Sequence, residues 1–449
     1  MVDKKAIITV LSVLAGFVTV IIVLRGFDGS PPTVTFSTPF DVAGAKTALR
    51  LHVEDMRTGL KYVSVAIEQG EERYVIAVQQ FEGPRWLTLW KGGPEKQFDL
   101  DLIPYSDREI PRKEGDATLI ITAEDYSWRH LSGGNRQAIV HEFRTKFRAP
   151  QLERLSSRHV INQGGAELVR YRVSDDAVRH GVEIAKRFFP GYSILGSGDH
   201  FAMLAFPFTE TENIPIFIVA RDEAENQSKI PVPYDLVKKT WRQRKINIDD
   251  RFIQRTVHPL IAQSSEIDET GNPLSDFLAA NTTLRNITNQ RLAEIAKDTR
   301  PQRLWSGTFL QMSNSQVQAL FADRRDYYYN GEKVDTKDHL GYDLAATKNY
   351  PVEAGNTGVV IFAEDLGLYG NSVIIDHGYG LQSLYGHLAS FAVMVDEEIE
   401  KGQVVGYTGS TGMAGGDHLH FSMLLHGQQI NPIEWWDRQW IRLHIEDRL

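Results

Sequence analysis

The C-terminal third of the chain consists of short β-branched runs separated by glycines, and this pattern constrains the fold more than any other feature. The runs lie at Gly358–Phe362, Ser372–Ile375, Gln382–Tyr385 and Gln403–Tyr407. Tight turns between short strands are typical of an antiparallel sheet, whereas parallel strands need long crossover connections. We therefore predict a compact antiparallel β domain over residues 301–437, followed by a C-terminal tail over residues 438–449.

The other end of the chain carries an uncharged apolar run over residues 6–24. As a helix this run spans roughly 30 Å, about one bilayer core. It has no polar face, which argues against a buried soluble helix. Lys4 and Lys5 favour a cytoplasmic N-terminus, and Arg25–Asp28 is a poor cleavage site, so we favour an uncleaved signal anchor over a cleaved signal peptide. We expect residues 1–29 to be a cytoplasmic stub and transmembrane anchor in the inner (cytoplasmic) membrane, single-pass, with the bulk of the chain periplasmic.

Two stretches of alternating apolar and polar residues follow. Short strand-like runs such as Leu49–Val53 and Thr118–Ala123 are separated by turn residues, which is typical of antiparallel sandwiches. The segment at 42–55 resembles the segment at 161–175, which indicates a repeat. We predict two immunoglobulin-like β-sandwiches, over residues 30–148 and 149–232. Such modules are commonly spacers, so we favour a rigid stalk over a platform for further envelope proteins.

Residues 233–300 have a different pattern. Apolar residues recur at helical spacing after Gly271–Pro273. We predict a helical connector without visible chemistry of its own. The fold class is therefore mainly β: an N-terminal transmembrane helix, two immunoglobulin-like β-sandwiches, a helical connector and a C-terminal antiparallel β domain.

Composition excludes several classes of protein. With 42% apolar and 24% charged residues, the chain is a normal globular sequence. It has no cysteine, which excludes disulfides, thiolate nucleophiles and cysteine-ligated metals. A net charge of −9 and a pI of about 5.9 argue against a nucleic-acid partner.

The C-terminal domain contains six of the chain's 14 histidines. His418 and His420 are two residues apart, so on a strand both imidazoles face one side. His339 and Asp343 are both competent zinc ligands, and Gly341 between them indicates a loop entering a strand rather than a helix. His387 follows a glycine turn. Of the two remaining histidines, His377 is expected to close a hairpin and His426 is expected to face solvent at a turn.

Together, the motifs HLGYD, YGHL and GSTGMAGGDHLHFSM closely resemble those of the lysostaphin-type zinc endopeptidases, which cut peptidoglycan cross-bridges. The resemblance covers residues 301–437. It implies one Zn²⁺ ion held by His339, Asp343 and His420, with His387 and His418 as catalytic residues that do not bind the metal. The main departure is Met413–Asp417, and it concerns the loop shape and substrate preference rather than the chemistry. Amidase activators of this family have lost some of these residues.

Elementary chemistry agrees with that implied set. Two neutral histidines and one carboxylate leave a zinc ion with an open fourth position, which is typical of catalytic sites. Such a metal acidifies bound water and polarises a carbonyl. We expect His418 to act as the general base and His387 to orient the water or stabilise charge, although these two roles could be exchanged.

We therefore expect a membrane-anchored zinc metalloendopeptidase that hydrolyses peptide cross-links of bacterial peptidoglycan. The resemblance implies that the bond joins D-alanine to diaminopimelate in stem peptides. Residues 6–24 would contact the inner membrane, and the sandwiches or the connector would gate the groove. The alternative is a catalytically silent wall-binding scaffold or amidase activator that uses the same groove. The intact set of five residues counts against that alternative.

Overall fold

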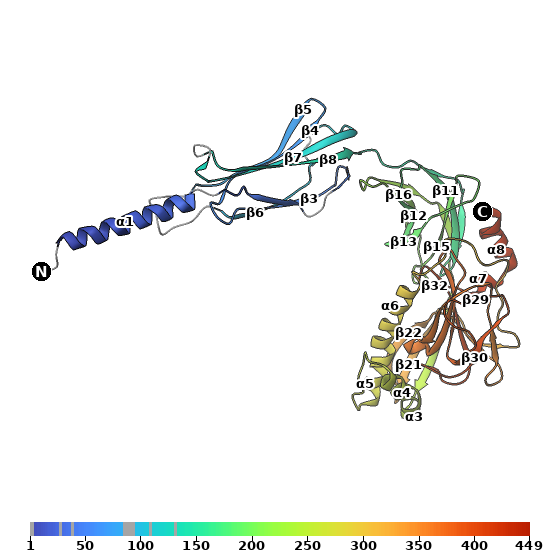
Figure 1. Ribbon diagram of the computed structural model, residues 1–449. Helices are drawn as coiled ribbons and strands as arrows, with labels where there is room; N and C mark the ends of the chain where they lie inside the picture. The colour runs from blue at the N-terminus through green and yellow to red at the C-terminus, as the bar shows by residue number, and fades with distance from the viewer. Residues whose placement is uncertain (1–3, 27–28, 37–39, 84–94, 107–109, 130–132) are drawn as a thin grey trace. The chain divides into compact units, whose positions relative to one another are not determined.

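The computed structural model describes residues 4–26, 29–36, 40–83, 95–106, 110–129 and 133–449 (Figure 1). The chain is mainly β, with 44% strand and 16% helix, as the sequence predicts. It divides into two compact units. The first comprises Met1–Pro150, Asp175–Val178 and Ala220–Ser228, and the second comprises Gln151–Ser174, Arg179–Val219 and Lys229–Leu449.

Residues Lys4–Gly26 form helix α1, at the position of the apolar run. In the part of the chain that the structure describes, no helix is long and apolar enough to cross a membrane. The predicted transmembrane assignment of residues 6–24 is therefore not supported.

The first unit contains a three-stranded sheet in the order β1-β3-β6 and a five-stranded sheet in the order β2-β8-β7-β4-β5. The strands are β1 (Thr33–Phe36), β2 (Val42–Ala43), β3 (Leu49–Glu54), β4 (Leu60–Gln69), β5 (Glu72–Gln80), β6 (Gln97–Leu102), β7 (Gly115–Asp125) and β8 (Arg136–Thr145). Alternate residues of β3 and β7, such as Leu51 and Leu119, are fully buried in one core. This alternation has the period of two that the sequence shows.

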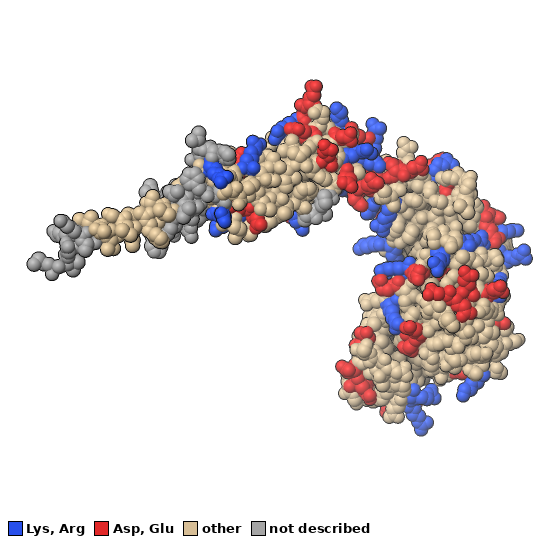
Figure 2. Space-filling model, in the orientation of Figure 1, with Lys and Arg blue, Asp and Glu red and all other residues tan. Residues whose placement is uncertain are grey.

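The next strands form two four-stranded sheets, β14-β15-β11-β9 and β13-β12-β16-β17, and the pair β10-β18. Their bounds are β9 (Leu152–Arg154), β10 (His159–Asn162), β11 (Ala166–Val173), β12 (Arg179–Ile184), β13 (Arg187–Pro190), β14 (Tyr192–Ser193), β15 (His200–Ala205), β16 (Ile216–Arg221), β17 (Gln227–Pro231) and β18 (Tyr234–Val237). Acidic and basic side chains are interspersed over the face drawn in Figure 2, consistent with a small net charge.

A helical segment follows β19 (Gln243–Ile248). It consists of α3 (Asp250–Phe252), η1 (Ile253–Val257), α4 (His258–Gln263), α5 (Pro273–Leu278), η2 (Ala279–Leu284) and α6 (Arg285–Ile295). Both η1 and η2 are π-helical turns. The apolar side of this segment, including Phe277 and Leu284, packs with Tyr327 and Leu368 in one core cluster. The helices therefore lie directly against the C-terminal domain.

The C-terminal domain contains an antiparallel sheet in the order β20-β23-β31-β27-β26-β25-β29, in which β32 also pairs with β31. Smaller sheets are formed by β19-β21-β22 and β24-β30-β28. The elements are β20 (Gln316–Ala319), β21 (Asp323–Tyr329), β22 (Glu332–His339), β23 (Tyr342–Ala345), β24 (Pro351–Glu353), β25 (Gly358–Asp365), η3 (Gly367–Tyr369), β26 (Asn371–Asp376), β27 (Leu381–Gly386), β28 (Leu388–Phe391), β29 (Glu398–Ile399), β30 (Val404–Thr408), β31 (Leu419–Leu425), β32 (Gln428–Ile430), α7 (Ile433–Trp436), α8 (Arg438–His444) and η4 (Glu446–Arg448).

The strand register brings the motif residues together. On the paired strands β23 and β31, Asp343 lies opposite His420. On the other side of β31, Gly386 of β27 also lies opposite His420, which places His387 beside this position. Antiparallel neighbours hold such partners about 5 Å apart, so three distant motifs meet at one end of the sheet.

Candidate metal centre

His339, Asp343 and His420 form a compact buried cluster. His339 ends β22, Asp343 lies in β23 and His420 lies in β31. Asp343 Oδ1 is 2.9 Å from His339 Nε2 and 3.0 Å from His420 Nδ1. The two histidine nitrogens are 3.0 Å from each other. The structure therefore brings together the three residues for which the resemblance implies metal ligation.

The outer nitrogen of each histidine in this cluster is held by a specific partner. His339 Nδ1 lies 3.0 Å from the backbone carbonyl of Leu320, and a carbonyl can only accept. His420 Nε2 lies 2.9 Å from Ser422 Oγ, whose own proton goes to the carbonyl of Leu340 at 2.7 Å. Both outer nitrogens must therefore carry the proton, which leaves His339 Nε2 and His420 Nδ1 as bare acceptors facing Asp343.

This donor set fits a zinc ion. Three acceptor atoms that lie about 3 Å apart repel one another unless a cation or a proton lies among them. Ligands with bonds of about 2.05 Å at tetrahedral angles are roughly 3.3 Å apart, close to the spacing here. Histidine ligands whose other nitrogen donates to a fixed acceptor are the common arrangement at metal sites. His339, Asp343 and His420 would hold the ion.

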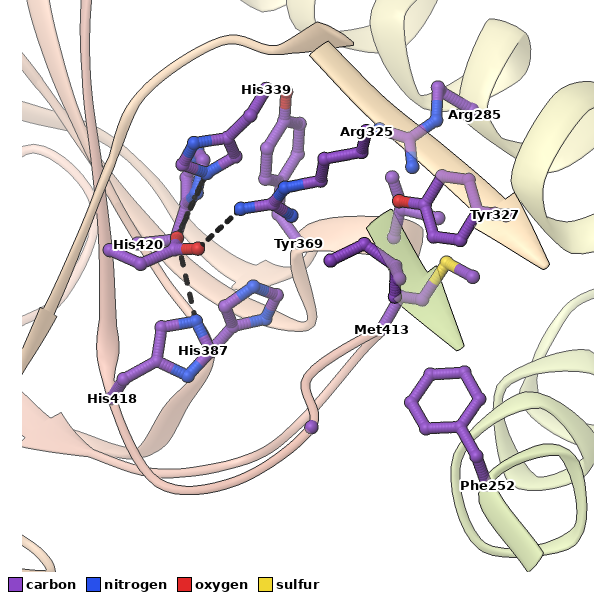
Figure 3. Close-up of a pocket in the computed structure, with 14 residues that line it drawn as sticks. Phe252, Arg285, Arg325, Tyr327, His339, Tyr369, His387, Met413, His418 and His420 are labelled. Atoms are coloured by element: carbon purple, nitrogen blue, oxygen red, sulfur yellow. Dashed lines mark hydrogen bonds and ion pairs between the residues drawn. The ribbon is translucent and has the colours of Figure 1, made fainter. Parts of the chain in front are cut away.

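The two other motif histidines lie beside this cluster (Figure 3). The rings of His387 and His418 have centroids 4.9 Å apart. His387 Nδ1 donates to the carbonyl of Thr411 and His418 Nδ1 to the carbonyl of Gly416, both at 2.8 Å. Each Nε2 is therefore available at the site, and His418 Nε2 is 3.5 Å from Asp343 Oδ1.

Local backbone geometry sets these positions. His387 lies between β27 and β28 and has a φ of +62°, in the left-handed region. This backbone conformation, and not the alternation of a strand, sets the direction of its side chain. Its backbone N–H donates to the carbonyl of Tyr369 at 2.7 Å. A Cβ on Gly341 would lie 2.6 Å from His420 Nε2 and 2.6 Å from Ser422 Oγ. Glycine is therefore needed at position 341 for His420 to occupy the site.

Burial and charge shift the pKa values of the cluster. Burial lowers the pKa of His420 to about 4. Burial also holds the pKa of His387 well below its usual range, with a further contribution from the neighbouring histidines. A neutral imidazole is the form that binds a metal or accepts a proton.

The pocket around the cluster has a volume of about 200 Å³. Sequence reasoning did not identify several of its lining residues, because they carry no motif. Arg325 on β21 donates to Asp343 Oδ2 at 2.7 Å and so fixes the second oxygen of that carboxylate. Tyr327 lies on the same strand. Arg285 and Phe252 come from the helical segment.

The two histidines outside the motif set have structural surroundings. His377 is fully buried, with Nδ1 2.7 Å from the carbonyl of Thr357 and Nε2 2.8 Å from Ser383 Oγ. His426 lies at the predicted turn between β31 and β32, but the expectation that it faces solvent is wrong. Its ring stacks on Tyr192, because the neighbouring sandwich packs against this turn.

A zinc-type donor set with two further histidines, at one end of an antiparallel sheet, has the groups that metal-dependent hydrolysis uses. Residues 337–432 match the family described as Peptidase family M23, so the chain contains a domain of that family. The family is zinc-dependent and is one of peptidoglycan hydrolases.

Curated relatives are similar over stretches of about 95 residues. The DD-carboxypeptidase/endopeptidase Mpg of Neisseria meningitidis serogroup B is 41% identical over 95 residues, which is 21% of this chain and 22% of that protein. The murein hydrolase activator EnvC of Escherichia coli is 37% identical over 98 residues, or 22% of this chain and 23% of that protein. The chain therefore matches about a fifth of the length of such relatives.

Among solved structures, the catalytic domain of lysostaphin from Staphylococcus simulans is similar, with 24% identity and a TM-score of 0.24. That similarity covers 28% of this chain and 96% of the lysostaphin domain.

Proposed function

We propose that the protein is a zinc metalloendopeptidase that hydrolyses peptide cross-links of bacterial peptidoglycan. One observation carries the proposal: each of four imidazoles donates one ring proton away from the pocket. For three of them the acceptor is a backbone carbonyl, and for His420 it is the hydroxyl of Ser422, which in turn donates a hydrogen bond to a carbonyl. Their other nitrogens face one pocket together with Asp343. A purely structural cluster has no need of so many bare acceptors, which repel one another.

In this proposal each residue has a defined task. His339, Asp343 and His420 hold the ion, and Arg325 and Ser422 keep the carboxylate and the imidazole of His420 in place. When bound, zinc would supply an acidified water and would polarise the carbonyl of the cleaved bond. His387 and His418 each present Nε2 as a proton acceptor. One takes the proton of the attacking water, and the other stabilises charge as an imidazolium.

The decisive experiment uses the purified protein on cross-linked peptidoglycan, with and without a chelator, and identifies the products by mass spectrometry. We expect chelator-sensitive loss of cross-linked dimers. His387→Ala and His418→Ala should each lower the rate about 10²- to 10⁴-fold while the protein keeps its zinc. His420→Ala should lose the zinc as well. Loss of metal from the His387→Ala variant would refute the assignment of His387 as a residue that does not bind the ion.

The rival function is that of a catalytically silent activator of a separate wall hydrolase; EnvC is by name a murein hydrolase activator. It predicts a different outcome of the same experiment. A zinc-loaded protein that leaves peptidoglycan intact but stimulates a separate wall hydrolase would replace our proposal with the activator function.

Peptidoglycan lies outside the cytoplasm, so this function requires the C-terminal domain to lie there too. The periplasmic location of the bulk of the chain stays a prediction. A reporter enzyme that is active only in the periplasm, fused after Leu449, should be active. A reporter that is active only in the cytoplasm, fused at the same place, should be silent.

A further inference from the structure

Arg285 introduces a second guanidinium group into the pocket that holds the candidate metal centre, and it comes from the helical segment outside residues 337–432. In Figure 3 the four imidazoles lie on one side, Arg285 and Tyr327 lie on the other, and Arg325 extends between them. The two arginines differ in their partners. Arg325 is paired with Asp343 Oδ2 at 2.7 Å. Among the residues that the structure describes, no carboxylate forms an ion pair with Arg285.

The guanidinium of Arg285 is nevertheless held in place. Its Nε donates to the backbone carbonyl of Asn281 at 3.1 Å, and one terminal nitrogen donates to Asn281 Oδ1 at 2.7 Å. Asn281 is itself fully buried, and its Nδ2 donates to Asp335 Oδ2 at 2.8 Å. The charge of Asp335 is paired with Lys337 Nζ at 3.0 Å rather than with Arg285. Arg285 is therefore oriented by neutral groups while its charge is left uncompensated.

The backbone that carries this arrangement is unusual. Asn281 lies in the π-helical turn η2, and Arg285 is the first residue of α6. Isolated π-helical turns interrupt otherwise regular helices and occur frequently at functional sites. A half-buried, oriented guanidinium without a counter-ion is the arrangement that binds a carboxylate, because its remaining N–H groups can donate in parallel to both oxygens.

We propose that Arg285 binds a free carboxylate of the substrate peptide, on the amine side of the cleaved bond. The inference rests on the proposed function, because it takes the bond to be cut at the neighbouring metal centre. Arg285 lines the same pocket as His339 and His420, so one short peptide bound there can contact both. On the carbonyl side, the α-carboxyl group of the residue forms part of the bond that is cut and so carries no free charge. A free α-carboxylate next to that bond therefore belongs to the amine-side residue.

Two peptide sources offer this chemistry. One is a chain terminus, in which the last residue carries its own carboxylate. The other is a branched cross-link, in which the amine-side residue is a diamino acid that keeps its α-carboxylate. Both place the anion at the same distance from the cleaved bond, so Arg285 would select for the carboxylate in either case.

The test compares acetyl-D-alanyl-D-alanine with its C-terminal carboxamide, titrated into the full-length protein by calorimetry in the presence of a chelator, where no bond is cut. We expect the wild type to bind the acid about 10- to 100-fold more tightly than the amide. Arg285→Gln should abolish that preference, and Arg285→Lys should restore part of it. Arg291→Gln is the matched control, because Arg291 lies on the same helix with an exposed side chain outside this pocket.

Equal or undetectable binding of the two peptides by the wild type would overturn the proposal, and so would an unchanged preference in Arg285→Gln. A branched peptide with a diamino acid on the amine side, compared with its amide, identifies which source binds more tightly. A carboxylate preference in a protein that leaves peptidoglycan intact would refute the proposed hydrolase and the amine-side placement, and would leave only the binding of a carboxylate by Arg285. Cleavage of peptidoglycan by a protein that shows no carboxylate preference would refute this inference while keeping the proposed hydrolase.

Discussion

Ser422 provides the sharpest test of how the cluster is prepared for a metal. Its Oγ accepts from His420 Nε2 at 2.9 Å and donates to the carbonyl of Leu340 at 2.7 Å, and its side chain is fully buried. The Ser422→Ala change removes the acceptor of that imidazole proton. His420 can then place its proton on Nδ1 and donate it to Asp343 Oδ1, 3.0 Å away, which blocks the nitrogen that faces the metal.

The size of the effect follows from the groups left unpaired. In the variant, zinc binding would return the proton to Nε2, where no acceptor remains, at a cost of about 1–3 kcal/mol. Loss of an outer partner of a metal-binding histidine typically lowers metal affinity about 10- to 100-fold, which agrees with that range. We therefore expect the dissociation constant for zinc to rise by 1–2 orders of magnitude, while all three ligands remain.

The assay is a zinc titration in competition with a chromophoric chelator. Ser383→Ala is a matched control, because Ser383 is equally buried and its Oγ lies 2.8 Å from Nε2 of His377, outside the cluster. Both variants should lose stability to a similar extent, but only Ser422→Ala should lose zinc affinity. A wild-type zinc affinity in Ser422→Ala, or an equal loss in Ser383→Ala, would refute the reasoning.

Three further predictions follow from single contacts. Gly341→Ala, whose Cβ would lie 2.6 Å from His420 Nε2, should weaken zinc binding at least about 10-fold in the same titration, and unchanged binding would contradict the close approach. Burial raises the pKa of Glu434 to about 8, so the folded state retains a proton that the unfolded state releases. The free energy of unfolding should therefore fall by about 2 kcal/mol between pH 6.5 and 8, and Glu434→Gln should flatten this slope in denaturant titrations. Burial lowers the pKa of His377 to about 4, so the unfolded state takes up a proton at a higher pH than the folded state does. The free energy of unfolding should therefore fall by about 3 kcal/mol as the pH falls from 6.5 towards 4. A difference in stability between wild type and His377→Gln that does not change with pH would contradict this.

Much of the C-terminal domain follows from local patterns. The predicted run at Ser372–Ile375 lies within β26, and the run at Gln382–Tyr385 lies within β27. Such strands can be read from the sequence because β-branched residues and glycine turns act over a few neighbours. The prediction that Gly341 lies on a loop entering a strand also agrees with the structure, in which β22 ends at His339 and β23 begins at Tyr342.

Other features depend on contacts between distant parts of the chain. The connector was expected to carry no chemistry, yet it contributes Arg285 to the pocket, because the apolar side of its helices packs with Tyr327 and Leu368. The expectation that His426 faces solvent failed for the same reason, since Tyr192 of the sandwich covers it. No local pattern contains such information, because it depends on which surfaces pack together.

The residue types of His339, Asp343 and His420 define the donor chemistry of the candidate site, and local sequence patterns predict the strands and turns that carry them. Which nitrogen of each imidazole faces the pocket depends instead on tertiary contacts. That choice depends on outer partners such as the Leu320 carbonyl and Ser422 Oγ. A proton on an imidazole is located by the nearest acceptor, and strand pairing and loop packing bring that acceptor within 3 Å.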